Sequence, residues 1–177
     1  MSKISTGYLY FLTAGIITLL ALCFYTQTQA TNYAQTARGA DVYVLSDTQK
    51  LTVGQPTTID ILVTNDTTPL NAMEAELFFN PTLFAVSDVA FHTELCEERF
   101  IIDNLIDNTL GRIHISCGTV TPFTGSATLF GTVTLTPLQA GIGKIEFGGK
   151  THVYIHDGLG TQIARDTYDQ TFLISEV

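Results

Sequence analysis

The chain has 177 residues, enough for one ordinary globular domain and a short appendage. Hydrophobic residues make up 45% of the chain, which is enough to build a core, and charged residues make up 14%. All 17 acidic residues but only seven of the eight basic residues follow position 36, so this part carries a formal charge of −10. That charge disfavours binding to nucleic acids or to anionic membranes.

The first 25 residues resemble an export segment. Lys3 supplies a short positive start, and residues 8–25 contain no charge. This uncharged run is longer than a usual signal-peptide core and lies at the short end of a membrane-spanning helix. Two alternatives remain open: cleavage after Ala30, or retention as a transmembrane anchor with the domain outside. Both predict an extracellular or cell-surface protein.

Residues 26–40 are polar and rich in Thr and Gln, which predicts a flexible linker. From residue 41 to residue 177, short β-rich runs alternate with turn signals. Nine strands are predicted, at residues 41–46, 57–64, 72–79, 83–91, 112–117, 127–136, 144–147, 151–156 and 170–174. Their spacing predicts an all-β, nine-stranded jelly-roll sandwich, preceded by one N-terminal hydrophobic helix. Residues 94–105 form the one stretch of this region with a helical alternative.

Alternation assigns inward and outward faces to these strands. The side chains expected to face the core are Ile59, Ile61, Val63, Met73, Ala75, Leu77, Phe79, Ile113, Ile115, Cys117, Leu129, Gly131, Val133 and Leu135. Glu74, Glu76, His114, Phe130 and Thr132 are expected on the opposite, outer faces. In this assignment His114 is an ordinary surface residue.

Cys96 and Cys117 are the two cysteines that follow the export segment. In an exported protein they would lie in an oxidising compartment, which favours a disulfide. The bridge would close a loop of roughly 20 residues and stabilise the fold by about 3 kcal/mol. The alternative is a pair of free, buried thiols.

Several segments, in this order, resemble the cohesin domain of cellulosomes, a relative of carbohydrate-binding modules of families 2 and 3. They are residues 52–56 (TVGQP), 59–63 (IDILV), 70–81 (LNAMEAELFFNP), 122–125 (PFTG), 129–133 (LFGTV) and 141–147 (GIGKIEF). The resemblance implies a nine-stranded sandwich that binds a dockerin-type protein module. Dockerins tether polysaccharide-degrading enzymes to scaffolds or cell surfaces, and in these pairs the dockerin usually carries the calcium.

The resemblance also implies binding through one sheet face, which includes polar side chains on the strand that ends at Asn80-Pro81. The predicted partner-binding residues are therefore Glu74 and Glu76, with His114 and Thr132 on neighbouring strands. The family often has Asn at the position of Ala72, so this chain departs from the pattern there.

The sequence contains no recognised catalytic motif, and neither an enzyme activity nor a cofactor is predicted. Asp103, Asn104, Asp107 and Asn108 could offer oxygen ligands to calcium, but their spacing fits a turn with side-chain hydrogen bonds better. His152 and His156 would lie about 13 Å apart along a strand, too far to share a metal ion. Glu74 and Glu76 have a spacing that a glycosidase could use, but an open sheet offers no cleft.

Two other functions remain as alternatives to protein docking. One is polysaccharide binding, which the absence of Trp and the scattered positions of the seven Tyr residues weaken. The other is a structural spacer in a surface or adhesion assembly. Membrane contact is expected through the N-terminal segment alone.

Overall fold

The computed structural model describes residues 39–176. The predicted export segment and most of the predicted linker lie outside these residues. Within residues 39–176, no helix has the length and apolar character needed to cross a membrane.

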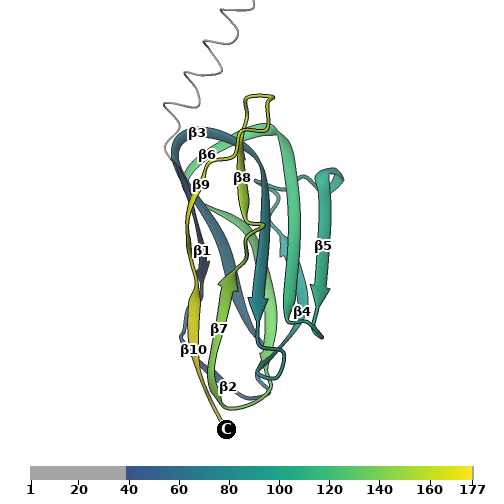
Figure 1. The fold of residues 1–177 in the computed structure, drawn as a ribbon, viewed down its shortest axis with the longest axis vertical. Coiled ribbons are helices and arrows are strands. Elements are labelled where there is room, and N and C mark those ends of the chain that lie inside the picture. Colours follow the sequence, from purple (N-terminus) through teal and green to yellow (C-terminus); the bar gives the residue numbers. More distant parts are fainter. Residues whose placement is uncertain (1–38, 177) are drawn as a thin grey trace, which may run out of the picture. The chain divides into compact units, whose positions relative to one another are not determined.

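The described part of the chain is almost entirely β-strand, as predicted (Figure 1). It contains ten strands and one 3-10 helix: β1 (Ala40–Leu45), β2 (Lys50–Thr52), β3 (Thr57–Phe79), β4 (Phe84–Phe91), η1 (Glu98–Phe100), β5 (Ile101–Asp107), β6 (Arg112–Pro137), β7 (Gly141–Phe147), β8 (His152–Ile155), β9 (Ala164–Tyr168) and β10 (Gln170–Ser175).

Two long strands join the two layers of a β-sandwich. The first half of β3 pairs with β1 and with the second half of β6, and β9 and β4 complete this layer, in the order β9-β1-β3-β6-β4. The second half of β3 pairs with the first half of β6, with β8 and with β7. In that layer β5 lies beyond β6, while β10 and β2 lie beyond β7. Each long strand unites two runs that the sequence predicts as separate strands.

The core lies between the layers and contains most of the side chains predicted to face inward. Ile59, Ile61, Met73, Ile113 and Ile115 are each at most 1% exposed. Because alternate residues of these strands face the core, the residues between them face outward. The outer faces therefore carry the polar side chains.

The predicted orientation of Phe130 is wrong. Ile61 pairs with Gly131 but Leu62 pairs with Leu129, so Phe130 is an extra residue in β6. Such a β-bulge reverses the alternation locally. Phe130 is fully buried and packs edge-on against Phe91, with ring centroids 6.0 Å apart.

The segment with a helical alternative, residues 94–105, contains only the three-residue 3-10 helix η1 and then enters strand β5. The predicted disulfide is confirmed: Cys96 and Cys117 are bridged, and both are buried. Ile101, the first residue of β5, pairs with Cys117. The bridge therefore ties the connection before β5 to the strand on which β5 pairs.

Candidate functional site

A connected group of polar side chains lies on the outer surface of the second layer, across β5, β6, β3 and β8. We call this group the polar face; it comprises Glu74, Glu76, Asp103, Arg112, His114, His152 and Tyr154. The β3 members alternate with the core residues Met73, Ala75 and Leu77. The strands hold these side chains in fixed register, since Glu76 pairs with His114, and Glu74 with His152.

His114 connects three strands of the polar face. Its Nδ1 lies 2.8 Å from Asp103 Oδ2 on β5, and its Nε2 lies 2.7 Å from Glu74 Oε1 on β3. The His114 side chain is only 13% exposed, against 24% for Glu74 and 44% for Asp103. His114 is therefore not the plain surface residue that alternation predicts, but the centre of a network with two carboxylates.

Glu76 faces away from the core as predicted, but it is covered by other groups and is only 6% exposed. Its Oε1 lies 2.8 Å from Arg112 Nη2, and its Oε2 accepts a hydrogen bond from the Lys150 backbone N–H. Glu76 and Arg112 thus form a half-buried ion pair beside the His114 network. Glu74 is the more accessible of the two glutamates.

The β8 edge of the polar face adds His152 and Tyr154. Burial raises the pKa of Tyr154, and the negative charge of Glu74 raises it further. His152 is half-buried, and its Nδ1 has no hydrogen-bond partner within the described part of the chain. His156 is exposed and follows the end of β8, so the two histidines do not form one site.

Thr132 is not part of this surface. It lies in the second half of β6, paired with Asp60 and Ala90 in the other layer. Its hydroxyl donates a hydrogen bond to Asp60 Oδ1 over 2.7 Å. The structure thus brings Glu74, Glu76 and His114 together and places Thr132 elsewhere, because the two halves of β6 belong to different layers.

Sequence reasoning did not place Asp103 and Arg112 on the polar face. The sequence offers Asp103 as a possible calcium ligand, whereas in the structure it contacts His114. Asp107 instead accepts hydrogen bonds from two backbone N–H groups of its own turn, and Asn108 pairs with the backbone of Val86. The predicted side-chain hydrogen bonds within a turn are therefore confirmed for Asp107, whereas Asn108 ties the turn to β4 and Asp103 and Asn104 lie within strand β5. Among residues 39–176, no group of three or more His, Cys, Asp or Glu is arranged to hold a metal ion.

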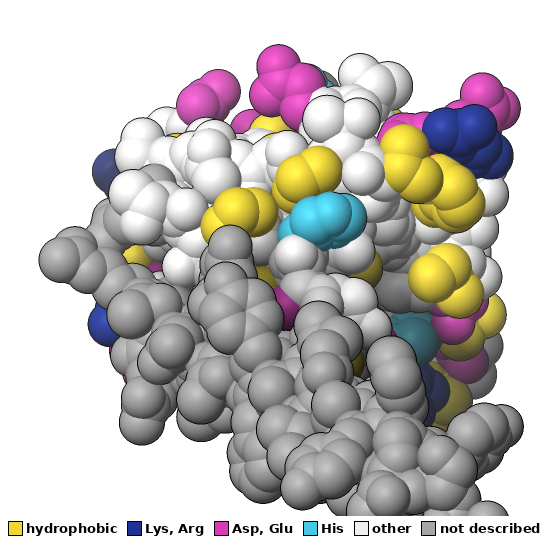
Figure 2. Space-filling view, turned by 90° about the horizontal axis from the view of Figure 1, so that it is seen from above, with side chains coloured by type: hydrophobic (Ala, Val, Ile, Leu, Met, Phe, Trp, Pro, Cys, Tyr) yellow, Lys and Arg dark blue, Asp and Glu magenta, His cyan; other side chains and the backbone are white. Residues whose placement is uncertain are grey.

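An apolar margin lies beside the polar face, on and just before the edge strand β5. Ile102 is 78% exposed and Leu105 is 45% exposed, and Phe100 and Ile101 are also exposed. Exposed apolar side chains next to ordered polar groups are typical of protein-binding surfaces. The end view in Figure 2 shows hydrophobic, acidic and histidine side chains exposed near one another at that end of the domain.

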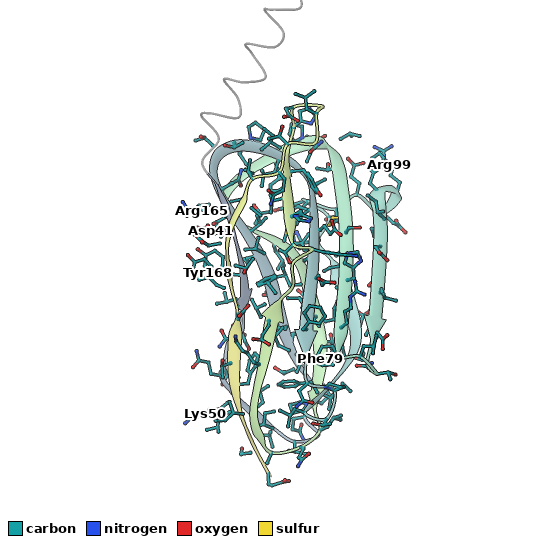
Figure 3. The ribbon with its side chains drawn as sticks, viewed as in Figure 1. Asp41, Lys50, Phe79, Arg99, Arg165 and Tyr168 are labelled. Atoms are coloured by element: carbon teal, nitrogen blue, oxygen red, sulfur yellow. A yellow bond between two sulfur atoms is a disulfide. The ribbon has the colours of Figure 1, made fainter. Side chains whose placement is uncertain are left out.

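A second cluster lies on the opposite layer, where β9 pairs with β1 (Figure 3). The rings of Tyr43 and Tyr168 stack with centroids 4.4 Å apart, and Arg165 Nη2 lies 2.7 Å from Asp41 Oδ2. The hydrogen bond and charge of Asp41 raise the pKa of Arg165. These contacts fasten β9 to the first strand of the domain.

The two-layer arrangement of these strands is a cohesin-like β-sandwich. The described structure matches a cohesin in a type I cohesin–dockerin complex (Coh-OlpC–Doc435) from Clostridium thermocellum, with a TM-score of 0.68 and 14% identity over 80% of this chain and 97% of that one. It matches the seventh ScaB type I cohesin from Pseudobacteroides cellulosolvens with a TM-score of 0.67 and 11% identity, over 79% and 94%.

A third match is a non-cellulosomal cohesin from the archaeon Archaeoglobus fulgidus, with a TM-score of 0.62 and 14% identity over 77% of this chain and 91% of that chain. At these identities the matches show the fold, and the chain has the cohesin fold. No protein-family model matches the sequence, and no curated protein sequence matches it.

Proposed function

We propose that this protein is a non-catalytic docking module that binds a dockerin-type protein partner through the polar face. The observation that supports this most is the Asp103–His114–Glu74 network on the outer surface of a cohesin-fold sheet. Side chains that are already fixed by neighbouring contacts lose little conformational freedom on binding, which favours affinity. The solved structures of this fold include cohesins in complex with dockerins.

The chemistry of the polar face restricts the kind of partner. Glu74 and Asp103 offer carboxylate oxygens beside an apolar margin, and the region after residue 36 carries a charge of −10. A complementary partner presents basic or hydrogen-bond-donating side chains next to apolar ones. A nucleic acid would be repelled by this surface.

The proposed setting is the cell surface or the extracellular space, with the N-terminal segment acting as a signal peptide or a membrane anchor. The uncharged run at residues 8–25 supports export. The Cys96–Cys117 bridge also supports it, because disulfides persist mainly in oxidising compartments. The proposed role is the assembly of polysaccharide-degrading or cell-surface complexes, which the resemblance to cohesins supports.

The test is affinity capture with the purified, oxidised full chain against the extracellular proteins of its own source, with and without calcium. A captured protein is identified by mass spectrometry, produced separately and titrated against the chain by calorimetry. We expect a calcium-dependent partner with a duplicated helix–loop segment, because cohesin partners usually carry the ion.

The matched variants are Glu74→Lys, which reverses charge on the polar face, and Lys144→Glu, which reverses charge in a surface ion pair on β7. Glu74→Lys should weaken binding at least tenfold. Lys144→Glu should change the affinity less than threefold, because exposed charges outside the centre of a binding surface contribute little. Unchanged affinity of Glu74→Lys would remove the polar face as the binding surface. Failure to capture any dockerin-type partner would remove the proposed function.

A further inference from the structure

The geometry around His114 sets a requirement on its protons. Both ring nitrogens lie within hydrogen-bond distance of carboxylate oxygens, at 2.8 Å to Asp103 and 2.7 Å to Glu74. An ionised carboxylate only accepts hydrogen bonds, whereas a neutral imidazole has one donor and one acceptor nitrogen. With a neutral ring, one of the two contacts would therefore place a nitrogen lone pair against a carboxylate oxygen.

Two protonation patterns satisfy both contacts: a doubly protonated imidazolium between two carboxylates, or a neutral imidazole with one protonated carboxyl. Asp103 and Glu74 are 44% and 24% exposed, so water solvates both carboxylates, which favours their charged forms. Two flanking negative charges favour a positive ring between them. The imidazolium pattern is therefore the better fit.

The other charged and titratable groups on this surface are consistent with that pattern. On β3, Glu76 is paired with Arg112, the neighbouring cation on β6. This pairing limits the repulsion between Arg112 and a positive ring. On β8, His152 pairs in register with Glu74, and Tyr154 remains protonated near neutral pH. Asp103 is the group that reaches the ring from β5.

We propose that His114 binds a second proton and, as an imidazolium, clamps edge strand β5 to β3. When His114 is protonated, β5 is held in place at the edge of the polar face. As the pH rises and the second proton is lost, β5 becomes more mobile. The structural reason is that β5 pairs only with β6 in the described part of the chain, so His114 provides its side-chain connection to β3. The consequence for partner binding rests on the proposed function, whereas the proton itself does not.

The direct test is NMR of the full chain labelled with ¹⁵N at histidine, followed from about pH 5 to pH 9, the range in which histidines exchange their protons. The ¹⁵N shifts of each ring distinguish an imidazolium from the two neutral tautomers. We expect both His114 nitrogens to remain protonated at a pH where the exposed His156 is neutral. A neutral, single-tautomer His114 at the same pH as neutral His156 would overturn the proposal.

Two variants keep the test independent of the folding of a His114 variant. In Glu74→Gln the amide can donate to Nε2, so a neutral ring with its proton on Nδ1 satisfies both contacts. We expect the second proton to be absent in Glu74→Gln at neutral pH. His152→Gln is the matched control, since it changes the other histidine near Glu74, and it should leave the His114 signals in place.

Hydrogen exchange and binding complete the test. Backbone amides of β5 should exchange at least tenfold faster relative to those of β1 when the pH-corrected rates above and below the His114 transition are compared. With the identified partner, affinity should fall at least threefold across the same transition. If NMR shows the imidazolium but no dockerin-type partner is captured, the proposed function is refuted and the clamp stands. If a partner binds tightly and its affinity does not depend on pH, the coupling of the clamp to docking is refuted.

Discussion

Reduction of the Cys96–Cys117 bridge should lower the free energy of unfolding by an amount that depends on the length of the loop that the bridge closes. The bridged residues are 21 positions apart and both are buried. Closing a loop of this length removes unfolded-state entropy worth about 3.4 kcal/mol at 25 °C in the chain-entropy model. For a domain of this size, that corresponds to a fall of about 10 °C in the midpoint of thermal unfolding.

The assay is urea unfolding of the full chain, followed by tyrosine fluorescence, with and without reductant. A double variant, Cys96→Ala with Cys117→Ala, provides the comparison without reductant, and its loss should exceed that of the reduced wild type by the packing of two sulfur atoms. Because β5 begins beside Cys117, its amides should lose more exchange protection than those of β1. A loss below about 1 kcal/mol in the reduced protein would refute the loop-entropy reasoning.

Three further predictions concern the folded domain. Gly111→Ala should lower the free energy of unfolding, measured by calorimetry, by more than about 2 kcal/mol, because Gly111 has φ of +65° and an added Cβ would collide with a β3 carbonyl. Gly149 has open space around it, so the control variant Gly149→Ala should change the free energy of unfolding by less than about 0.5 kcal/mol. Phe130→Ala should cost about 3–5 kcal/mol in urea unfolding, and a loss under about 1 kcal/mol would contradict its burial at the bulge. The hydrogen bond from the Val120 backbone, with further bonds, holds the pKa of Glu97 below its ordinary value of 4.5. Glu97 therefore adds stability above that pH, and this stability is lost as the pH falls. Acid unfolding of Glu97→Gln should show a weaker pH dependence than that of the wild type, and an unchanged profile would refute this reasoning.

The sequence was sufficient to predict the sandwich because its core strands alternate cleanly. Ile59, Ile61 and Met73 face inward as their period of two predicts. The disulfide was predictable on the expectation of export, because two cysteines in an oxidising compartment favour a bridge. These features depend on local pattern and on chain-wide composition, both of which a sequence displays directly.

Other features depend on contacts that alternation does not encode. Strand β5 was missed because two exposed isoleucines, Ile101 and Ile102, begin it and its register shifts just after Ile101. Phe130 was placed on the wrong face because a single inserted residue reverses the pattern. Missing β5 also hid the role of Asp103, so the sequence alone could not reveal that His114 lies between two carboxylates.

The tyrosine geometry leads to a last prediction, which concerns polysaccharide binding. A flat glucan chain needs aromatic rings that lie side by side with their faces open. Tyr43 and Tyr168 instead stack on each other, with only 4° between their planes, so each covers one face of the other. Tyr154 lies on β8 in the other layer of the sandwich and cannot extend them into a strip.

We therefore expect the full chain to remain in the supernatant when microcrystalline cellulose is pelleted, at concentrations where a carbohydrate-binding module of this fold type is depleted. Tyr168→Ala serves as the matched control, because Tyr168 is the more exposed member of the stack. Depletion of the wild type but not of Tyr168→Ala would show that the open face of a single stacked ring is enough for glucan binding. The Tyr43–Tyr168 pair would then be a sugar-binding site on the layer opposite the polar face, and one domain would carry two separate binding surfaces.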